Sequence, residues 1–163
     1  MTISDSTTAE WTVITDNVMG GLSEGAVAHN DDGFTVFSGS VSLENNGGFA
    51  SMRYTGALPD LSGCQGFKLF VQGDGKTYQL RAHSKSAERG HAFKCDFRTT
   101  PGEWVEVELP FTDFVLSAHG QLKPEAGKLN PADIDQISVL IAGGQRGAFC
   151  LQIQDIAATC CSS

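Results

Sequence analysis

The amino-acid sequence predicts an all-β fold, a jelly-roll β-sandwich of two sheets. Short apolar stretches with a period of two recur along the whole chain, as half-buried strands require. Gly, Asn, Asp and Pro separate these stretches, and the 163 residues include 19 glycines, which implies many turns. Segments long enough for the helices of βαβ crossovers are missing. We therefore expect one domain over residues 1–163, with a core at about 10–158 and short disordered ends.

The first half of the chain has the longest alternating segment. Residues 34–44 alternate Thr and Ser with Val and Leu and predict one strand, in which Gly39 indicates a bulge or a close backbone approach. Residues 45–47 are Asn-Asn-Gly, which tolerate the positive φ of tight turns. Residues 34–44 and 48–54 are therefore expected to pair as a hairpin.

Four more strand candidates occupy the middle of the chain. Residues 67–71 and 78–82 flank a Gly-Asp-Gly-Lys turn at 73–76, which predicts a second hairpin. This turn lacks the spacing and the following helix of a phosphate-binding loop, so the pattern does not indicate nucleotide binding. Residues 91–98 and 104–109 also alternate strictly, so each is expected to bury one face.

The last third combines apolar strands with short helical turns. Residues 137–142 and 149–156 are apolar enough to lie centrally in a sheet. A turn is expected at 112–116, after a proline. Residues 130–133 read Asn-Pro-Ala-Asp, which indicates a cap followed by proline at the first helical position.

Charge and cysteine content limit the classes of function. The formal net charge of −8 disfavours nucleic acid and anionic membranes as partners. The polar N-terminus lacks the features of a signal or transit peptide, and no apolar run is long enough to span a bilayer, so a cytoplasmic location is expected. The odd number of cysteines, without a C-x-x-C pair, predicts reduced thiols, with three of them as small core residues: Cys64, Cys95 and Cys150.

No catalytic or metal-binding constellation can be assembled from the sequence. The four histidines, His29, His83, His91 and His119, are scattered, and no serine lies in a nucleophile elbow. No cofactor is expected. A structural calcium ion at residues 31–33 or 60–63 is left open, although plain turn chemistry explains both clusters.

Two glycine-rich segments are the candidates for a binding surface. One follows the strand that begins at Trp11, and the other precedes an arginine in an apolar strand. A buried arginine needs an acidic partner, and Asp16 is a natural choice for Arg53. The two segments therefore either bind a partner or only lock the first loop onto the sheet. The candidate binding residues, with one aromatic added, are Asp16, Asn17, Met19, Gly20, Gly21, Ser23, Asn45, Asn46, Gly47, Gly48, Arg53 and Trp104.

The same segments resemble a known family. WTVITDNVMGGLS at 11–23 and FSGSVSLENNGGFASMR at 37–53 resemble motifs of the complex I intermediate-associated protein family. GDGKTY at 73–78, WVEVELPFTDF at 104–114 and ISVLI at 137–141 continue the pattern in order. The resemblance implies a galactose-binding-domain-like jelly roll and an assembly factor for respiratory complex I without catalytic residues. Because a transit peptide and a long N-terminal extension are missing, the chain resembles a minimal prokaryotic member.

Two functional hypotheses follow. The leading one is a non-catalytic, chaperone-like assembly factor that binds a protein client, such as subunits of respiratory complex I or of another membrane-associated complex. The alternative is a carbohydrate- or small-ligand-binding module of jelly-roll type, in which an exposed aromatic stacks on a sugar ring. Trp104 is the best candidate for that role because it lies on the face opposite Val105 and Val107. An enzyme is not expected.

Overall fold

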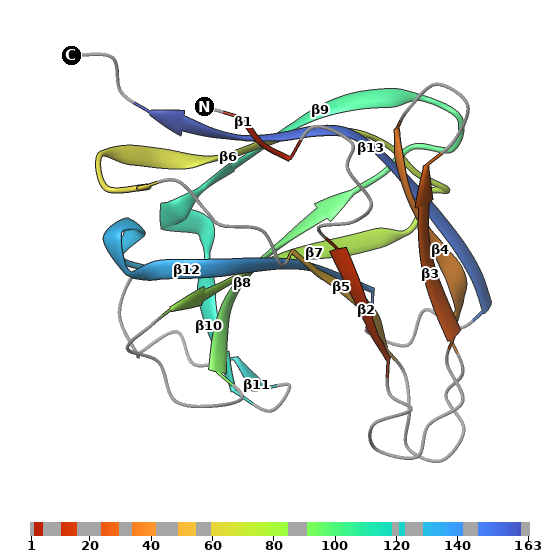
Figure 1. The fold of residues 1–163 in the computed structure, drawn as a ribbon, viewed down its shortest axis with the longest axis horizontal. Coiled ribbons are helices and arrows are strands. Elements are labelled where there is room, and N and C mark those ends of the chain that lie inside the picture. Colours follow the sequence, from red (N-terminus) through yellow and green to blue (C-terminus); the bar gives the residue numbers. More distant parts are fainter. Residues whose placement is uncertain are drawn as a thin grey trace.

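The computed structural model shows two antiparallel sheets packed face to face, which confirms the predicted β-sandwich (Figure 1). The structure describes residues 2–4, 11–15, 24–29, 34–41, 49–54, 60–84, 91–118, 121–122, 129–141 and 147–160. The strands come from all parts of the chain and enter both sheets out of sequence order.

Sheet A has the strand order β3-β4-β13-β6-β9, and β1 also pairs with β13. The longest strand, β13, lies between β4 and β6, which confirms the central position expected for 149–156. The strands of this sheet are β1 (Thr2–Ser4), β3 (Glu24–His29), β4 (Thr35–Val41), β6 (Cys64–Gln72), β9 (Trp104–Pro110) and β13 (Gly147–Cys160).

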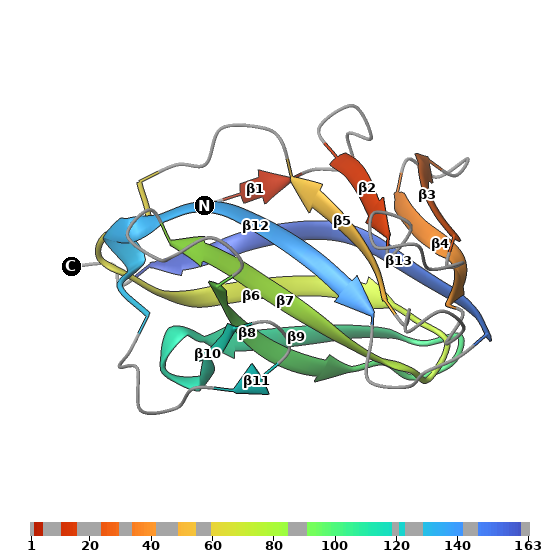
Figure 2. The same ribbon diagram turned by 90° about the horizontal axis from the view of Figure 1, so that it is seen from below.

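Sheet B has the order β11-β10-β8-β7-β12-β5-β2. Figure 2, turned to look from below, shows this sheet nearer the viewer, with β12 between β7 and β5, which confirms the central position expected for 137–142. Its strands are β2 (Trp11–Thr15), β5 (Ala50–Tyr54), β7 (Thr77–Ser84), β8 (His91–Arg98), β10 (Val115–Ala118), β11 (Gln121–Leu122) and β12 (Ile134–Ile141).

The core lies between the sheets and is built by the period-two alternation of the strands. On β6, Phe67, Leu69 and Val71 are fully buried while the residues between them are only half-buried. Rings pack edge to face within this layer: Phe67 lies 5.2 Å from Phe111 and 6.1 Å from Phe114 between ring centroids. Such ring pairs add to the stabilisation that burial alone provides.

Both predicted hairpins are wrong in their pairing. β4 pairs with β3 and β13 in sheet A, whereas β5 pairs with β2 and β12 in sheet B. In the same way β6 belongs to sheet A and β7 to sheet B. The chain does reverse between these strands, but each time it crosses from one sheet to the other. The sequence does not distinguish this from a hairpin, because the strands of both sheets show the same alternation of inner and outer side chains. At Gly39 the bulge is wrong, because the β4–β13 ladder passes through it without a shift of register, whereas the alternative of a close backbone approach stays a prediction.

Asp74 anchors the tight connection between β6 and β7. Its Oδ1 accepts hydrogen bonds from Lys76 N at 3.2 Å and Tyr78 Oη at 3.1 Å, and its Oδ2 accepts one from Cys150 N at 2.9 Å. Gly75 has a φ of +90°, which favours glycine. A Cβ on Gly73 would overlap the side chain of Thr99. The segment is thus a turn, as predicted, and Asp74 ties it to β13 of sheet A.

Two short 3-10 helices confirm the turn expected at 130–133 and, only in part, the one expected at 112–116, whose last two residues belong to strand β10. One spans Phe111–Asp113 and buries Phe111. The other spans Pro131–Asp133, where the side chain of Asn130 accepts a hydrogen bond from Ala132 N at 3.1 Å and proline occupies the first turn.

The cysteines differ from the sequence prediction. Cys64 is buried, but it is disulfide-bonded, so the expectation of reduced thiols is wrong there. Its backbone lies opposite that of Cys160 in the β6–β13 ladder. Cys95 and Cys150 are free; Cys95 is half-buried, whereas Cys150 is exposed because it points outward from β13.

Candidate functional site

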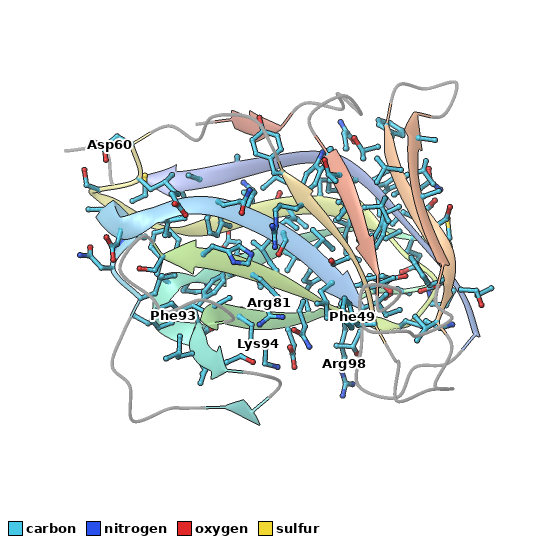
Figure 3. The ribbon with its side chains drawn as sticks, turned by 60° about the horizontal axis from the view of Figure 1, so that its bottom comes forward. Phe49, Asp60, Arg81, Phe93, Lys94 and Arg98 are labelled. Carbon is cyan, nitrogen blue, oxygen red and sulfur yellow. The ribbon has the colours of Figure 1, made fainter. Side chains whose placement is uncertain are left out.

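The outer face of sheet B carries a row of polar and charged side chains drawn from neighbouring strands. Arg53 on β5 lies opposite Ser138 on β12, and Ser138 lies opposite Arg81 on β7. Arg81 in turn lies opposite Lys94 on β8, and Figure 3 shows these two side chains side by side. We call these four residues, together with His83 on β7, the arginine row. The alternation of side chains along each strand explains why these residues share the outer face, because their neighbours on the same strand face the core.

The two arginines are half-buried and lack partners within the part of the chain that the structure describes. The Nε atoms of Arg53 and Arg81 are both buried without a hydrogen bond. The described ion pairs involve other cations, including Lys94, whose Nζ lies 2.8 Å from Oδ1 of Asp96. Burial lowers the pKa of the Arg81 guanidinium. Each guanidinium therefore has unused capacity to donate hydrogen bonds.

His83 joins the row through a hydrogen bond to Ser138. Its Nε2 lies 3.0 Å from Oγ of Ser138. Burial, together with the charges of Arg53 and Arg81, lowers the pKa of His83 to about 4, against the opposing effect of Asp135. The imidazole is therefore neutral at pH 7 and adds no third positive charge to the pair of arginines.

This lowered pKa predicts acid sensitivity. Because the unfolded chain binds a proton at His83 near pH 6.5 and the folded chain only near pH 4, stability is lost as the pH falls through this window. We expect His83 to account for about 2 kcal/mol of lost unfolding free energy between pH 7 and pH 5. Urea unfolding at both pH values measures the loss, and His83→Gln should remove that share of it. An unchanged pH dependence in the variant would contradict the assignment.

The structure describes only two of the predicted binding residues. Residues 16–23 and 45–48 lie outside the described residues, so their role and the suggested contact between Asp16 and Arg53 stay predictions. Arg53 lies in the arginine row, whereas Trp104 lies on the outer face of the other sheet. Sequence reasoning missed Arg81, His83 and Ser138. Their outward positions follow from alternation, but their position next to Arg53 depends on strand pairing.

Trp104 belongs to an aromatic cluster on the outer face of sheet A. It stacks on Phe70 with ring centroids 5.3 Å apart and meets Phe34 edge to face at 4.9 Å. Gln72 lies beside it in the register of β6 and β9, and its amide contacts that of Gln152 at 2.9 Å. The other tryptophan, Trp11, is buried against Tyr54 in the core, so it presents no surface for stacking.

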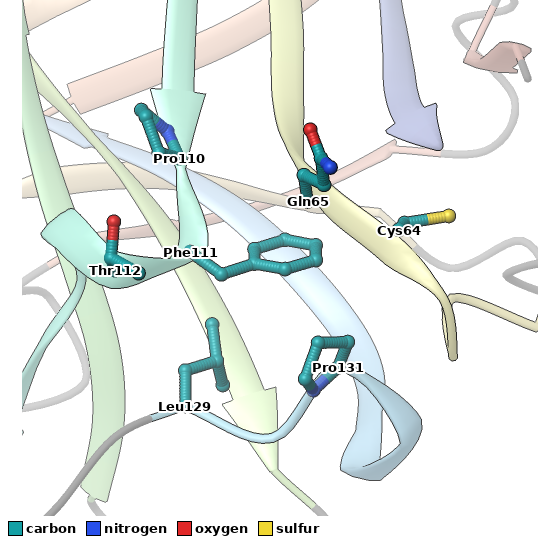
Figure 4. Close-up of a pocket in the computed structure, with 7 residues that line it drawn as sticks. All are labelled: Cys64, Gln65, Pro110, Phe111, Thr112, Leu129 and Pro131. Atoms are coloured by element: carbon teal, nitrogen blue, oxygen red, sulfur yellow. The ribbon is translucent and has the colours of Figure 1, made fainter. Parts of the chain in front are cut away.

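A pocket of about 480 Å³ opens at one end of the sandwich (Figure 4). Its lining is mostly apolar and combines β6, β9 and the 3-10 helices; the residues are Cys64, Gln65, Pro110, Phe111, Thr112, Leu129 and Pro131. It holds no acid–base pair that would support catalysis.

Metal ligands do not converge in the described part of the chain, where no group of three His, Cys, Asp or Glu side chains could hold an ion. Within residues 60–63, one of the two calcium candidates, Oδ1 of Asp60 accepts hydrogen bonds from N and Oγ of Ser62 at 3.0 and 2.7 Å. This is the plain turn chemistry that the sequence allowed; residues 31–33 lie outside the description. No helix among the described residues has the length and apolarity to cross a membrane.

Comparison with protein families matches residues 2–153 to the family described as complex I intermediate-associated protein 30. The match covers most of the chain, as the motifs led us to expect. No curated protein matches the chain.

Solved structures share the fold at low sequence identity. A family 11 carbohydrate-binding module from Clostridium thermocellum, in complex with a β-1,3-1,4-mixed-linked tetrasaccharide, is 17% identical, with a TM-score of 0.67 over 97% of this chain and 94% of that chain. The family 11 module of the cellulosomal cellulase Lic26A-Cel5E of Clostridium thermocellum is 16% identical, with a TM-score of 0.69 over 98% of this chain and 94% of that chain. An agarase is 9% identical, with a TM-score of 0.65 over 100% of this chain and 25% of that chain. At such identities the likeness concerns the fold.

Proposed function

Because the chain belongs to the complex I intermediate-associated protein 30 family, we propose that it is a non-catalytic module that binds a protein client during assembly of respiratory complex I or of another membrane-associated complex. The observation that carries this proposal is the outer face of sheet B. Four neighbouring strands hold the arginine row in fixed register there, so a client meets a rigid polar surface.

The two glycine-rich segments fit the same proposal. Thr15 at the end of β2 lies opposite Ala50 at the start of β5. Residues 16–23 follow the first of these strands and 45–48 precede the second, so both segments join sheet B at the same end of neighbouring strands. We propose that they extend the client surface that begins at Arg53.

Site-specific photo-crosslinking in extracts and membranes of the native cell tests the proposal. A photoreactive residue replaces Gln79, which points outward beside Arg81 on β7, and we expect it to capture subunits of respiratory complex I. The matched control carries the photoreactive residue at Glu108, an exposed position on the outer face of sheet A, and should capture none. Equal capture from both positions, or no respiratory subunit from Gln79, would refute the assignment of this face.

Carbohydrate binding is a second candidate, and the aromatic cluster favours it. Trp104 offers a ring on the outer face of sheet A with the amide of Gln72 beside it, which is the combination of stacking and polar contact that sugar rings use. The structural neighbours of this chain include a module solved with a mixed-linked tetrasaccharide. Titration with that tetrasaccharide, followed by tryptophan fluorescence in the unmodified chain and in Trp104→Phe, separates this function from client binding.

A further inference from the structure

Arg53 and Arg81 face each other across a single strand. Both lie directly opposite Ser138, one on each side of β12. Neighbouring strands are about 4.8 Å apart, so the two arginine Cα atoms are separated by roughly 10 Å. Arginine side chains are long enough to converge over the serine between them. The register therefore places one arginine on each side of Ser138, and the charges of both arginines act on His83.

This pair lacks the neutralisation that the lysines of the described chain have. Lys94 is held by Asp96 and Lys68 lies 3.4 Å from Glu106, whereas neither arginine has an acidic partner among the described residues. A half-buried cation whose buried Nε donates no hydrogen bond destabilises the fold. Such a group in a native protein therefore indicates a role in binding or catalysis. An acceptor supplied from outside would remove that cost.

The groups that surround the pair make it suitable for a carboxylate. Guanidinium donors match the two oxygens of a carboxylate in a planar, bidentate arrangement. His83 is neutral and hydrogen-bonded to Ser138, so it does not attract the anion by charge. Among the described residues, the acids near the arginines are Asp96, which is paired with Lys94, and the exposed Asp135. The ring-bearing residues of the strands beside the arginines point into the core: Tyr54, Tyr78, Phe93 and Phe97. Phe49, which directly precedes β5 and is half-buried, is a described aromatic side chain that alternation places on the same face as Arg53.

We propose that Arg53 and Arg81 together bind the carboxylate of a single glutamate or aspartate in an extended segment of the protein client, an inference that rests on the proposed function. Charge complementarity favours this occupant, because the pair is a local positive site on a protein whose net charge is −8. That net charge repels polyanions such as nucleic acid, but one acidic side chain meets only the local field.

Fluorescence anisotropy with the purified chain tests the site. The probe is a short, labelled peptide with one glutamate among neutral residues, and the matched probe has glutamine in place of that glutamate. We expect binding of the first probe only, weakening as salt is added. Arg53→Gln and Arg81→Gln should each raise the Kd about tenfold or more, since each removes charge-assisted hydrogen bonds. Arg81→Lys, which keeps the charge but loses the planar donor, should have an intermediate effect.

Lys68→Gln is the matched control, because it removes one positive charge from the outer face of sheet A; it should change the Kd less than twofold.

Urea unfolding provides a second readout. Removal of an unpaired arginine should leave the midpoint unchanged or raise it, whereas a lower midpoint in both variants would indicate a structural role and overturn the proposal. The proposal would also be overturned if both peptides bound equally well, or if an oligoglucuronate displaced the labelled probe more strongly than the unlabelled peptide did. If respiratory subunits still crosslink at Gln79 in Arg53→Gln/Arg81→Gln with unchanged yield, this inference fails while the proposed function stands.

Discussion

We expect Phe67→Ala to lower the free energy of unfolding by about 4 kcal/mol, the range found when a buried phenylalanine is truncated. Phe67 is fully buried in the middle of β6 and contacts the rings of Phe111 and Phe114. The substitution removes apolar burial and leaves a cavity that the two sheets, which are held in register by their ladders, cannot fill by collapse. Urea or thermal unfolding followed by circular dichroism measures the loss.

Phe70→Ala is the matched control on the same strand. Phe70 points outward, is half-buried and stacks on Trp104, so its truncation creates no internal cavity. We expect a loss of about 1 kcal/mol. Similar losses for the two variants would contradict the assignment of the inner and outer faces of sheet A.

Asp74→Ala should lower the unfolding free energy by about 3 kcal/mol, because it leaves a buried hydroxyl and two backbone N–H groups without this acceptor. The donors that lose it are Oη of the fully buried Tyr78, N of Cys150 and N of Lys76. Burial first, and the nearby Asp74 second, raise the pKa of Tyr78, so its phenol stays protonated and donates to the carboxylate. Chemical denaturation at neutral pH measures this loss.

Asp96→Ala provides the control for loss of a carboxylate. Its side chain is 52% exposed and contacts only Lys94 in the described ion pairs, so we expect a change below about 1 kcal/mol. Asp74→Asn, which keeps oxygen as an acceptor at one position, should lie between the two. If Asp74→Ala were as mild as Asp96→Ala, the turn would not depend on Asp74.

The strands could be predicted from the sequence, but their partners could not. Alternation in 67–71 and 104–109 marks which side chains face a core, and the structure confirms it. A turn such as Gly73–Asp74–Gly75 predicts that the chain reverses. It carries no information on whether the next strand pairs with the previous one or crosses to the opposite sheet, because both arrangements bury the same side chains. This is the reason that both expected hairpins were wrong.

The arginine row shows the same limit for a functional site. Arg53 could be singled out because a cation in an apolar strand is unusual. Arg81 lies in an ordinary alternating segment, 28 residues further along, as the numbering shows. Its position near Arg53 depends on β12, a strand that follows both arginines in the sequence and lies between their strands in sheet B. Only the registers of β5, β12 and β7 bring the two side chains together.

The central positions of β12 and β13 have a consequence for biosynthesis. A ribosome releases the chain from its N-terminus, so β4 and β6 emerge long before β13, the strand that joins them. Until residues 147–160 have been translated, sheet A consists of the separate ladders β3–β4 and β6–β9, and the nascent chain exposes the faces that later form the core. The core can therefore be completed only after residues 147–160 have emerged, and until then the nascent chain exposes apolar surface that is prone to aggregation.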